Sequence, residues 1–267
     1  MTLPLVTEMP EPQYVMSEDG FRLATYTWGD LDAPTVLAVH GFASSARDNW
    51  VATGWVRDLL RAGFRVLAVD QRGHGLSEKP HEPADFSMAN FVDDLRKVLN
   101  VYLIDEFVYL GYALGARVGW HTAVDMPQSL CRAVLGGIPD GKPLGRIDLA
   151  QAKAHLATGA EVTDPDTINY IRLAERVPGN DLRSLIALAE GMRFDDEDPD
   201  LGAPPTQPVL FATGEKDTVL EQSKKLAAGV PTGSFIEIPG RHHFNAPGSR
   251  HFREPGVAFL ADGFLDD

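Results

Sequence analysis

Short apolar runs rich in β-branched residues alternate along this chain with longer segments of helical periodicity. The runs are apolar at successive positions, which is typical of strands covered by helices on both faces. They occupy residues 35–39, 65–69, 107–110, 133–135, 209–212 and 235–238. Parallel neighbouring strands need a crossover connection, usually a helix, so this alternation constrains the chain to βαβ units around a parallel sheet.

Helical spacing is clearest after Ser87, which suits an N-cap. Apolar residues recur there at Phe91, Val92, Leu95, Val98, Leu99 and Tyr102, and this spacing predicts one amphipathic helix. Further helices are expected around residues 55–60 and over 116–126. Near the amino terminus, residues 14–29 predict a β-hairpin with Gly20 in its turn.

The strand pattern stops between residues 141 and 205. Three helical patterns cover residues 147–160, 164–177 and 181–192, and an acidic, proline-containing stretch follows them. We interpret this stretch as a solvated linker. The sequence therefore predicts one α/β core, formed by residues 1–140 and 206–267, with a helical insertion at 141–205.

Charge and cysteine content exclude several classes of function. The chain has 24 Lys and Arg against 38 Asp and Glu, a net charge of −14. This balance argues against binding to nucleic acid or to an anionic membrane. Cys131, the one cysteine, excludes an intramolecular disulfide and a multi-cysteine metal site, and we expect it to be a buried core residue. We expect no metal, because His81, His121, His155 and His251 have no partners at metal-ligand spacing. We expect no cofactor, because the glycine-rich runs lack phosphate-loop and dinucleotide spacing.

A strand–turn–helix motif carries the first chemical signal. The run over residues 107–110 continues directly into GYALG (111–115) and then into a helical segment. This is the G-x-S-x-G frame of a nucleophile elbow, with Ala113 in place of serine. The central residue of such a turn is strained, and the flanking glycines avoid clashes with neighbouring backbone.

The turn after residues 35–39 supplies a second signal. His40 and Gly41 follow the run, and a glycine here lets the backbone direct the next N–H into a pocket. We assign a two-donor oxyanion hole to the backbone amides of Phe42 and Leu114. His40 is expected to hold the loop.

Asp217 and His243 lie just past the last two predicted strands. Functional groups collect beyond the carboxyl ends of parallel strands, so both are expected near position 113. Such an acid fixes the imidazole tautomer, while the imidazole acts as general base and then as acid. Asp140 is an alternative acid, and His242 is an alternative histidine.

In this order the motifs resemble those of the α/β-hydrolase family over nearly the whole chain. The run DQRGHGLS (70–77) resembles the D-x-R-G-x-G-x-S segment of that family, which implies structural roles for His74 and Ser77. The resemblance implies a mostly parallel eight-stranded sheet with helices on both faces and makes residues 141–205 a lid inserted after the sixth strand. The residues expected to bind substrate are Tyr112, Trp50, Tyr170 and Met192.

Ala113 departs from the family pattern, because a methyl group cannot form an acyl-enzyme. Either serine was replaced by experiment, which the other intact motifs favour, or it was lost naturally. We therefore expect a hydrolase of small to medium esters or lactones, active with serine at position 113. The alternatives are a ligand-binding pseudoenzyme and a C–C hydrolase or cofactor-free dioxygenase. A cytoplasmic monomer or homodimer, with a small-molecule substrate as its partner, is expected.

Overall fold

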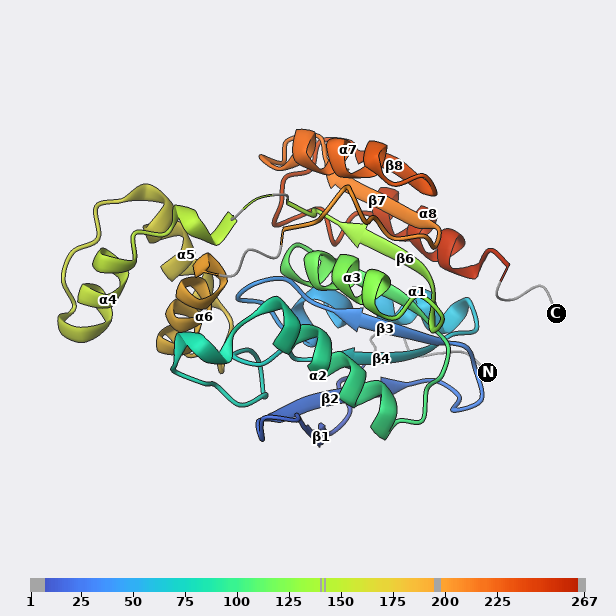
Figure 1. The fold of residues 1–267 in the computed structure, drawn as a ribbon, viewed down its shortest axis with the longest axis horizontal. Coiled ribbons are helices and arrows are strands. Elements are labelled where there is room, and N and C mark those ends of the chain that lie inside the picture. The colour runs from blue at the N-terminus through green and yellow to red at the C-terminus, as the bar shows by residue number, and fades with distance from the viewer. Residues whose placement is uncertain (1–7, 140, 142, 195–197, 264–267) are drawn as a thin grey trace.

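The computed structural model describes residues 8–139, 141, 143–194 and 198–263. These residues form an eight-stranded sheet in the order β1-β2-β4-β3-β5-β6-β7-β8 (Figure 1). In chain order the strands are β1 Gln13–Met16, β2 Arg22–Trp28, β3 Thr35–Val39, β4 Arg65–Val69, β5 Phe107–Tyr112, β6 Leu130–Gly136, β7 Val209–Gly214 and β8 Gly233–Ile238.

Strands β3 to β8 pair in parallel, and β2 runs antiparallel to both of its neighbours. The predicted amino-terminal hairpin is β1 and β2, and the six apolar runs are the six parallel strands. The mostly parallel eight-stranded architecture expected from the sequence is therefore confirmed.

Helices cover both faces of this sheet. Successive residues of β3 pack into two different clusters, Leu37 and Val39 into one and Val36 and Ala38 into the other. The first cluster contains residues of the helices α2 Met88–Val101, α3 Leu114–Asp125 and α7 Leu220–Gly229, and the second those of α1 Trp55–Arg61 and α8 Arg250–Ala261. Because every side chain of such a strand is buried, its sequence is uniformly apolar.

The structure tests the expected helix cap at Ser87, the expected helices and the expected burial of Cys131. Ser87 caps α2 by accepting a hydrogen bond from the amide of Asn90. Helices α7 and α8 lie outside the predicted helical segments, and Pro255 inside α8 disfavours a helix by its local chemistry. Cys131 is only partly buried, so the expectation of a core cysteine is wrong.

Three helices connect β6 to β7, as the spacing predicts. They are α4 Leu149–Thr158, α5 Pro165–Arg176 and α6 Leu182–Phe194, and they stand beyond one end of the sheet (Figure 1). Asp148 and Asp164 cap the first two by accepting hydrogen bonds from backbone amides. The acidic stretch after α6 is not only a solvated linker, because Asp198 forms an ion pair with Arg117 at 3.0 Å.

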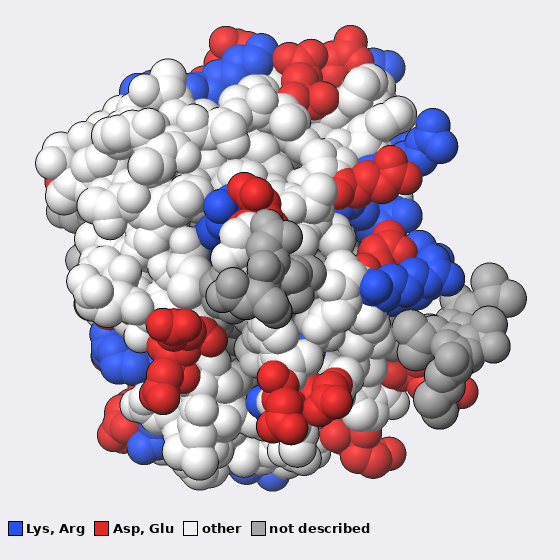
Figure 2. Space-filling model, turned by 90° about the vertical axis from the view of Figure 1, so that its right-hand side faces the viewer, with Lys and Arg blue, Asp and Glu red and all other residues white. Residues whose placement is uncertain are grey.

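The described residues at the end of the molecule away from α4–α6 carry no broad basic patch. Figure 2 shows the end of the molecule away from α4–α6, where Lys and Arg side chains lie beside Asp and Glu side chains. Among the described residues, no helix is long and apolar enough to cross a membrane.

Candidate functional site

Ala113 occupies a strained turn between β5 and α3. Its backbone angles are φ 51° and ψ −110°, a conformation that a non-glycine residue rarely adopts. The turn is held on both sides: the Ala113 amide donates to the Gly136 carbonyl at 2.8 Å, and its own carbonyl accepts from Ala116 and Arg117. The elbow geometry is therefore retained although the side chain is a methyl group.

The flanking glycines are required by close backbone approach. A Cβ atom on Gly115 would lie 2.1 Å from the carbonyl oxygen of Val39, and one on Gly111 would lie 2.4 Å from that of Gly115. Both distances are far inside van der Waals contact, so these glycines allow α3 to start directly against β3. This contact brings the elbow beside the loop that follows β3.

The loop after β3 is fixed by buried hydrogen bonds. His40 Nε2 accepts a hydrogen bond from the amide of Gln71 at 3.0 Å, so the ring proton is on Nδ1. Nδ1 donates this proton to the Gly41 carbonyl at 2.8 Å. Burial lowers the pKa of His40 and keeps it neutral. The Gly41 amide donates to Asn49 Oδ1 at 2.8 Å. Among the described residues, the amides of Phe42 and Leu114 have no hydrogen-bond acceptor.

His243 and Asp217 lie together at the ends of β8 and β7. His243 Nδ1 is 2.8 Å from Asp217 Oδ2, and the Asp217 side chain is 0% exposed. A buried carboxylate at Nδ1 orients the ring with Nε2 as the free acceptor. The Tyr112 hydroxyl donates to the His243 carbonyl at 2.6 Å and fixes this loop against β5. The arrangement can take a proton from a group at the elbow.

The structure describes one of the two alternative site residues, His242, but not the other, Asp140. His242 is exposed, and its Nδ1 accepts from the amide of Phe244, whereas His243 holds the carboxylate contact. Asp140 lies outside the described residues.

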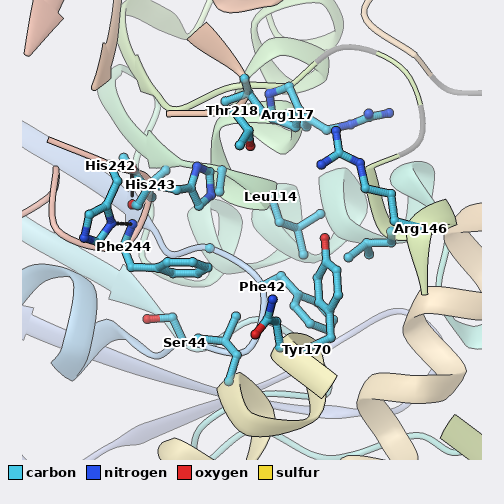
Figure 3. A pocket seen from close by; sticks show the side chains of 18 of the residues that line it. Phe42, Ser44, Leu114, Arg117, Arg146, Tyr170, Thr218, His242, His243 and Phe244 are labelled. Atoms are coloured by element: carbon cyan, nitrogen blue, oxygen red, sulfur yellow. Dashed lines mark hydrogen bonds between the residues drawn. The ribbon is translucent and has the colours of Figure 1, made fainter. Parts of the chain in front are cut away.

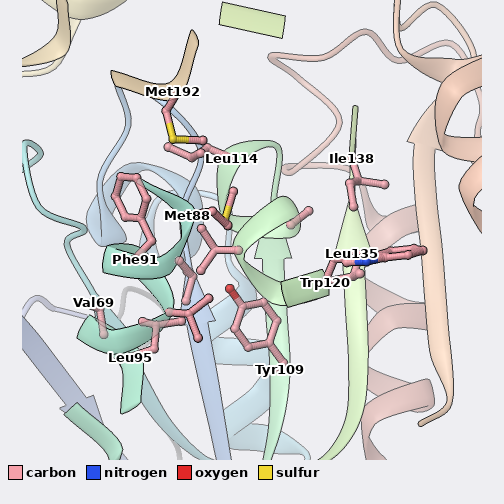
Figure 4. Packing of buried hydrophobic residues seen from close by; sticks show 14 of the residues in the cluster. Val69, Met88, Phe91, Leu95, Tyr109, Leu114, Trp120, Leu135, Ile138 and Met192 are labelled. Carbon is pink, nitrogen blue, oxygen red and sulfur yellow. The ribbon is translucent and has the colours of Figure 1, made fainter. Parts of the chain in front are cut away.

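A cavity of about 390 Å³ opens at this point, between the strand ends and the helices α5 and α6 (Figure 3). Its lining includes the predicted residues Phe42, Tyr112, Ala113, Leu114, Tyr170, Met192 and His243. Met192 of α6 lies beside Leu114 at the top of the first hydrophobic cluster (Figure 4). The ring of Tyr170 packs edge-on against Phe42 with centroids 5.6 Å apart.

Trp50 does not line the cavity. It is fully buried and packs against Trp55, on the opposite face of the sheet from Leu114. It lies on a short π-helix, Arg47–Val51, which directs the preceding residue Asn49 to the Gly41 amide instead. We therefore withdraw Trp50 as a substrate-binding residue.

His74 and Ser77 also lie outside the lining, in a buried network. Ser77 Oγ accepts from the amide of Ala24 at 2.8 Å, and His74 Nδ1 contacts the Arg72 carbonyl at 3.0 Å. Burial lowers the pKa of His74 well below its ordinary value. Their contacts are those of structural residues.

Four cationic side chains in the lining were missed by sequence reasoning: Arg117, Arg146, Arg176 and Lys216. Arg117 had a usable signal, since it lies four residues after Ala113 and therefore one helical turn above it. Lys216 also had a signal, since it lies directly before the predicted Asp217, just past the end of β7. Arg146 and Arg176 come from segments between β6 and β7, whose placement depends on how α4–α6 pack. Among the described residues, no group of His, Cys, Asp and Glu could hold a metal ion.

Known sequences match this chain over different lengths. A family model for the alpha/beta hydrolase fold matches residues 34–169, more than half of the chain. The Bifunctional esterase/perhydrolase DCH of Acinetobacter calcoaceticus is 27% identical over 86% of this chain and 92% of its own length. The AB hydrolase superfamily protein YfhM of Bacillus subtilis is 29% identical, but this chain spans only 42% of its length.

Solved structures match the fold over nearly the whole chain. The enol-lactonase from Burkholderia xenovorans LB400 has a TM-score of 0.74 at 19% identity and covers 93% of this chain and 99% of its own. The meta-cleavage product hydrolase from Pseudomonas fluorescens IP01 has a TM-score of 0.72 at 19% identity, with coverages of 94% and 97%. The chain thus belongs to the alpha/beta hydrolase family, and its neighbours there include an esterase, a lactonase and a C–C hydrolase.

Proposed function

We propose that this site hydrolyses small to medium carboxylic esters or lactones by a Ser-His-Asp mechanism when serine occupies position 113. The observation that carries the proposal is the 2.8 Å contact of His243 with the buried Asp217. It lies at the same cavity as the strained turn at Ala113 and the amides that have no described acceptor. The esterase and lactonase among its relatives support the same chemistry. The chain with Ala113 is the inactive form of this site.

The mechanism follows from the geometry. A serine hydroxyl at position 113 attacks the ester carbonyl while His243 takes its proton. Asp217 stabilises the imidazolium, and the amides of Phe42 and Leu114 stabilise the tetrahedral oxyanion. His243 then protonates the leaving alcohol and activates the water that releases the acid. With Ala113 there is no hydroxyl to form the acyl-enzyme, so the cycle cannot start.

Ala113→Ser is the direct test. We expect kcat/KM for p-nitrophenyl butyrate or a δ-lactone to rise by about 10⁴-fold or more, which is the scale of serine loss in such enzymes. The matched control combines Ala113→Ser with His243→Asn, which keeps the hydroxyl and removes its base. A folded Ala113→Ser protein without a gain on any ester, thioester, amide or lactone would contradict the proposal.

A second function is favoured by one observation, the intact cavity around the methyl group of Ala113. In this alternative the chain binds a small ligand and does no chemistry. It predicts tight ligand binding by the unmodified chain together with no esterase activity after Ala113→Ser. A C–C hydrolase is the third candidate, and it predicts turnover of a carbon–carbon substrate but not of esters by the serine variant.

A further inference from the structure

The charge of the cavity lining is opposite to the charge of the protein. The chain carries −14 overall, yet the described lining contains four Lys and Arg side chains and one carboxylate, Asp166. A concave site lined by one sign of charge concentrates ligands of the other sign. The lining therefore points to an anionic ligand.

Three of these cations are unpaired in the part of the chain that the structure describes. Arg117 already has protein partners, since it pairs with Asp198 at 3.0 Å and also donates to the Gly141 carbonyl. Arg146, Arg176 and Lys216 are exposed, and no described carboxylate lies within 4.0 Å of their charged groups. These three charges are free to meet a ligand.

The two arginines belong to the lid side of the cavity. Arg176 shares one face of α5 with Tyr170 and Leu173, because all three line the cavity at spacings of three residues. Burial raises the pKa of the Tyr170 hydroxyl, and Arg146 and Asp166 both lie close enough to act on it, Arg146 lowering the pKa and Asp166 raising it. Figure 3 shows Arg146 and the Tyr170 hydroxyl across Leu114 from His243.

Apolar side chains separate this cationic end from the reacting end. Leu114 lies between them in Figure 3, and Phe42, Leu173 and Met192 are further apolar residues of the lining. A matching ligand has its ester carbonyl at the elbow, a short apolar chain, and an anionic group at the far end. Guanidinium groups bind carboxylates with paired, charge-assisted hydrogen bonds.

We propose that the substrate is an ester or lactone whose acyl chain ends in a free carboxylate, bound by Arg146 and Arg176. This inference rests on the proposed function and deepens it by naming the substrate class. Lys216, at the strand-end side of the same cavity, adds to the positive field without contacting that carboxylate.

The kinetic test uses two esters of equal chain length in the Ala113→Ser background. Mono-p-nitrophenyl glutarate ends in a carboxylate, and p-nitrophenyl pentanoate ends in a methyl group. We expect kcat/KM, corrected for spontaneous hydrolysis, to be about tenfold or more higher for the glutarate. The preference should shrink as ionic strength rises.

Matched variants on the same background locate the effect. Arg146→Gln and Arg176→Gln should each lower kcat/KM for the glutarate about tenfold more than for the pentanoate. Arg172→Gln is the control, because Arg172 is an exposed residue of α5 that does not line the cavity. An equal effect of all three variants, or equal rates for the two esters, would overturn the anion site.

Binding to the unmodified Ala113 chain separates this inference from the proposed function. Calorimetry should give monomethyl glutarate a Kd about tenfold below that of methyl pentanoate, with the difference lost in Arg146→Gln. Ester hydrolysis by Ala113→Ser without a glutarate preference removes the anion site and leaves the hydrolase. Selective binding of monomethyl glutarate without hydrolysis of any ester keeps the anion site and removes the hydrolase. Absence of both selective binding and hydrolysis removes both proposals.

Discussion

The two sides of the cavity are built differently. On the core side, the side chains of His40 and Asp217 are 0% exposed, and each is fixed by hydrogen bonds to a neighbouring strand-end loop. On the lid side, by which we mean the segment between β6 and β7 that the sequence predicts to be a lid, Arg146 and Arg176 are exposed and unpaired among the described residues. The core side therefore holds groups in one geometry, as chemistry requires, whereas the lid side can adjust to a ligand.

The lid itself is attached unevenly. Helix α6 is seated on the core, since a Cβ atom on Gly191 would lie 2.2 Å from the Pro83 carbonyl oxygen. Other contacts between the lid and the core include the hydrogen bond that Asn180 donates to the Ala43 carbonyl at 3.0 Å, the pair of Asp181 with His81 at 2.7 Å, and the pair of Asp198 with Arg117 at 3.0 Å. Substitutions should therefore affect the two sides by different amounts and in different parameters.

The largest effect is expected from Asp217→Asn in the Ala113→Ser background. The amide presents a similar shape but favours the wrong imidazole tautomer and cannot stabilise the imidazolium. By analogy with the same exchange in other triads, kcat should fall about 10⁴-fold, or about 5.5 kcal/mol of transition-state stabilisation. Steady-state kinetics with p-nitrophenyl butyrate measure this.

The control for that experiment is Asp166→Asn, which removes the one described carboxylate of the lining without touching His243. A loss in kcat as large as that of Asp217→Asn would show that the lid side also positions reacting groups. The conclusion that only the core side holds the reacting groups in place would then be wrong.

A smaller effect is expected from the buried histidines of the core side. Burial lowers the pKa of His40 and that of His74, so below the ordinary value of 6.5 the unfolded chain binds protons that the folded chain excludes. The free energy of unfolding therefore falls as the pH falls below 6.5, and each histidine contributes at most about 1.4 kcal/mol per pH unit, a slope reached only well below pH 6.5 and above the pKa of the folded form.

His74→Gln removes one of these two contributions. Urea unfolding at several values between pH 6.5 and 5 should show a slope that is shallower than in the unmodified chain, by an amount that grows toward about 1.4 kcal/mol per pH unit at the acid end. Asp94, whose pKa burial raises to about 6, acts in both proteins and cancels in the difference. His251→Gln, at an exposed position, is the control, and identical slopes for all three proteins would show that the imidazole of His74 titrates normally.

The same contrast explains what could be read from the sequence. Strand-end residues such as Ala113, Asp217 and His243 follow short apolar runs, and the parallel sheet brings the ends of those runs to one edge whatever the lid does. Trp50 was misplaced because a short π-helix, Arg47–Val51, sets its direction, and no local sequence pattern predicts such a helix. Arg146, on the short helix Pro143–Arg146, and Arg176, at the end of α5, could not be assigned, because their approach to the cavity depends on how the segments between β6 and β7 pack, a tertiary property.

The smallest effect is expected from Asn180→Ala on the lid side. The substitution removes the hydrogen bonds of the Asn180 side chain to the carbonyls of Ala43 and Ala174. The free energy of unfolding should fall by about 1 kcal/mol. In the Ala113→Ser background, KM should rise about threefold and kcat should change less than twofold, because a looser α5 weakens binding without moving His243. Thr158→Ala, which removes a hydrogen bond inside the lid, is the control and should leave KM unchanged. A fall in kcat at constant KM would instead show that contact with the lid positions the loop at Ala43. The oxyanion amide of Phe42 would then depend on the lid side as well as on the core side.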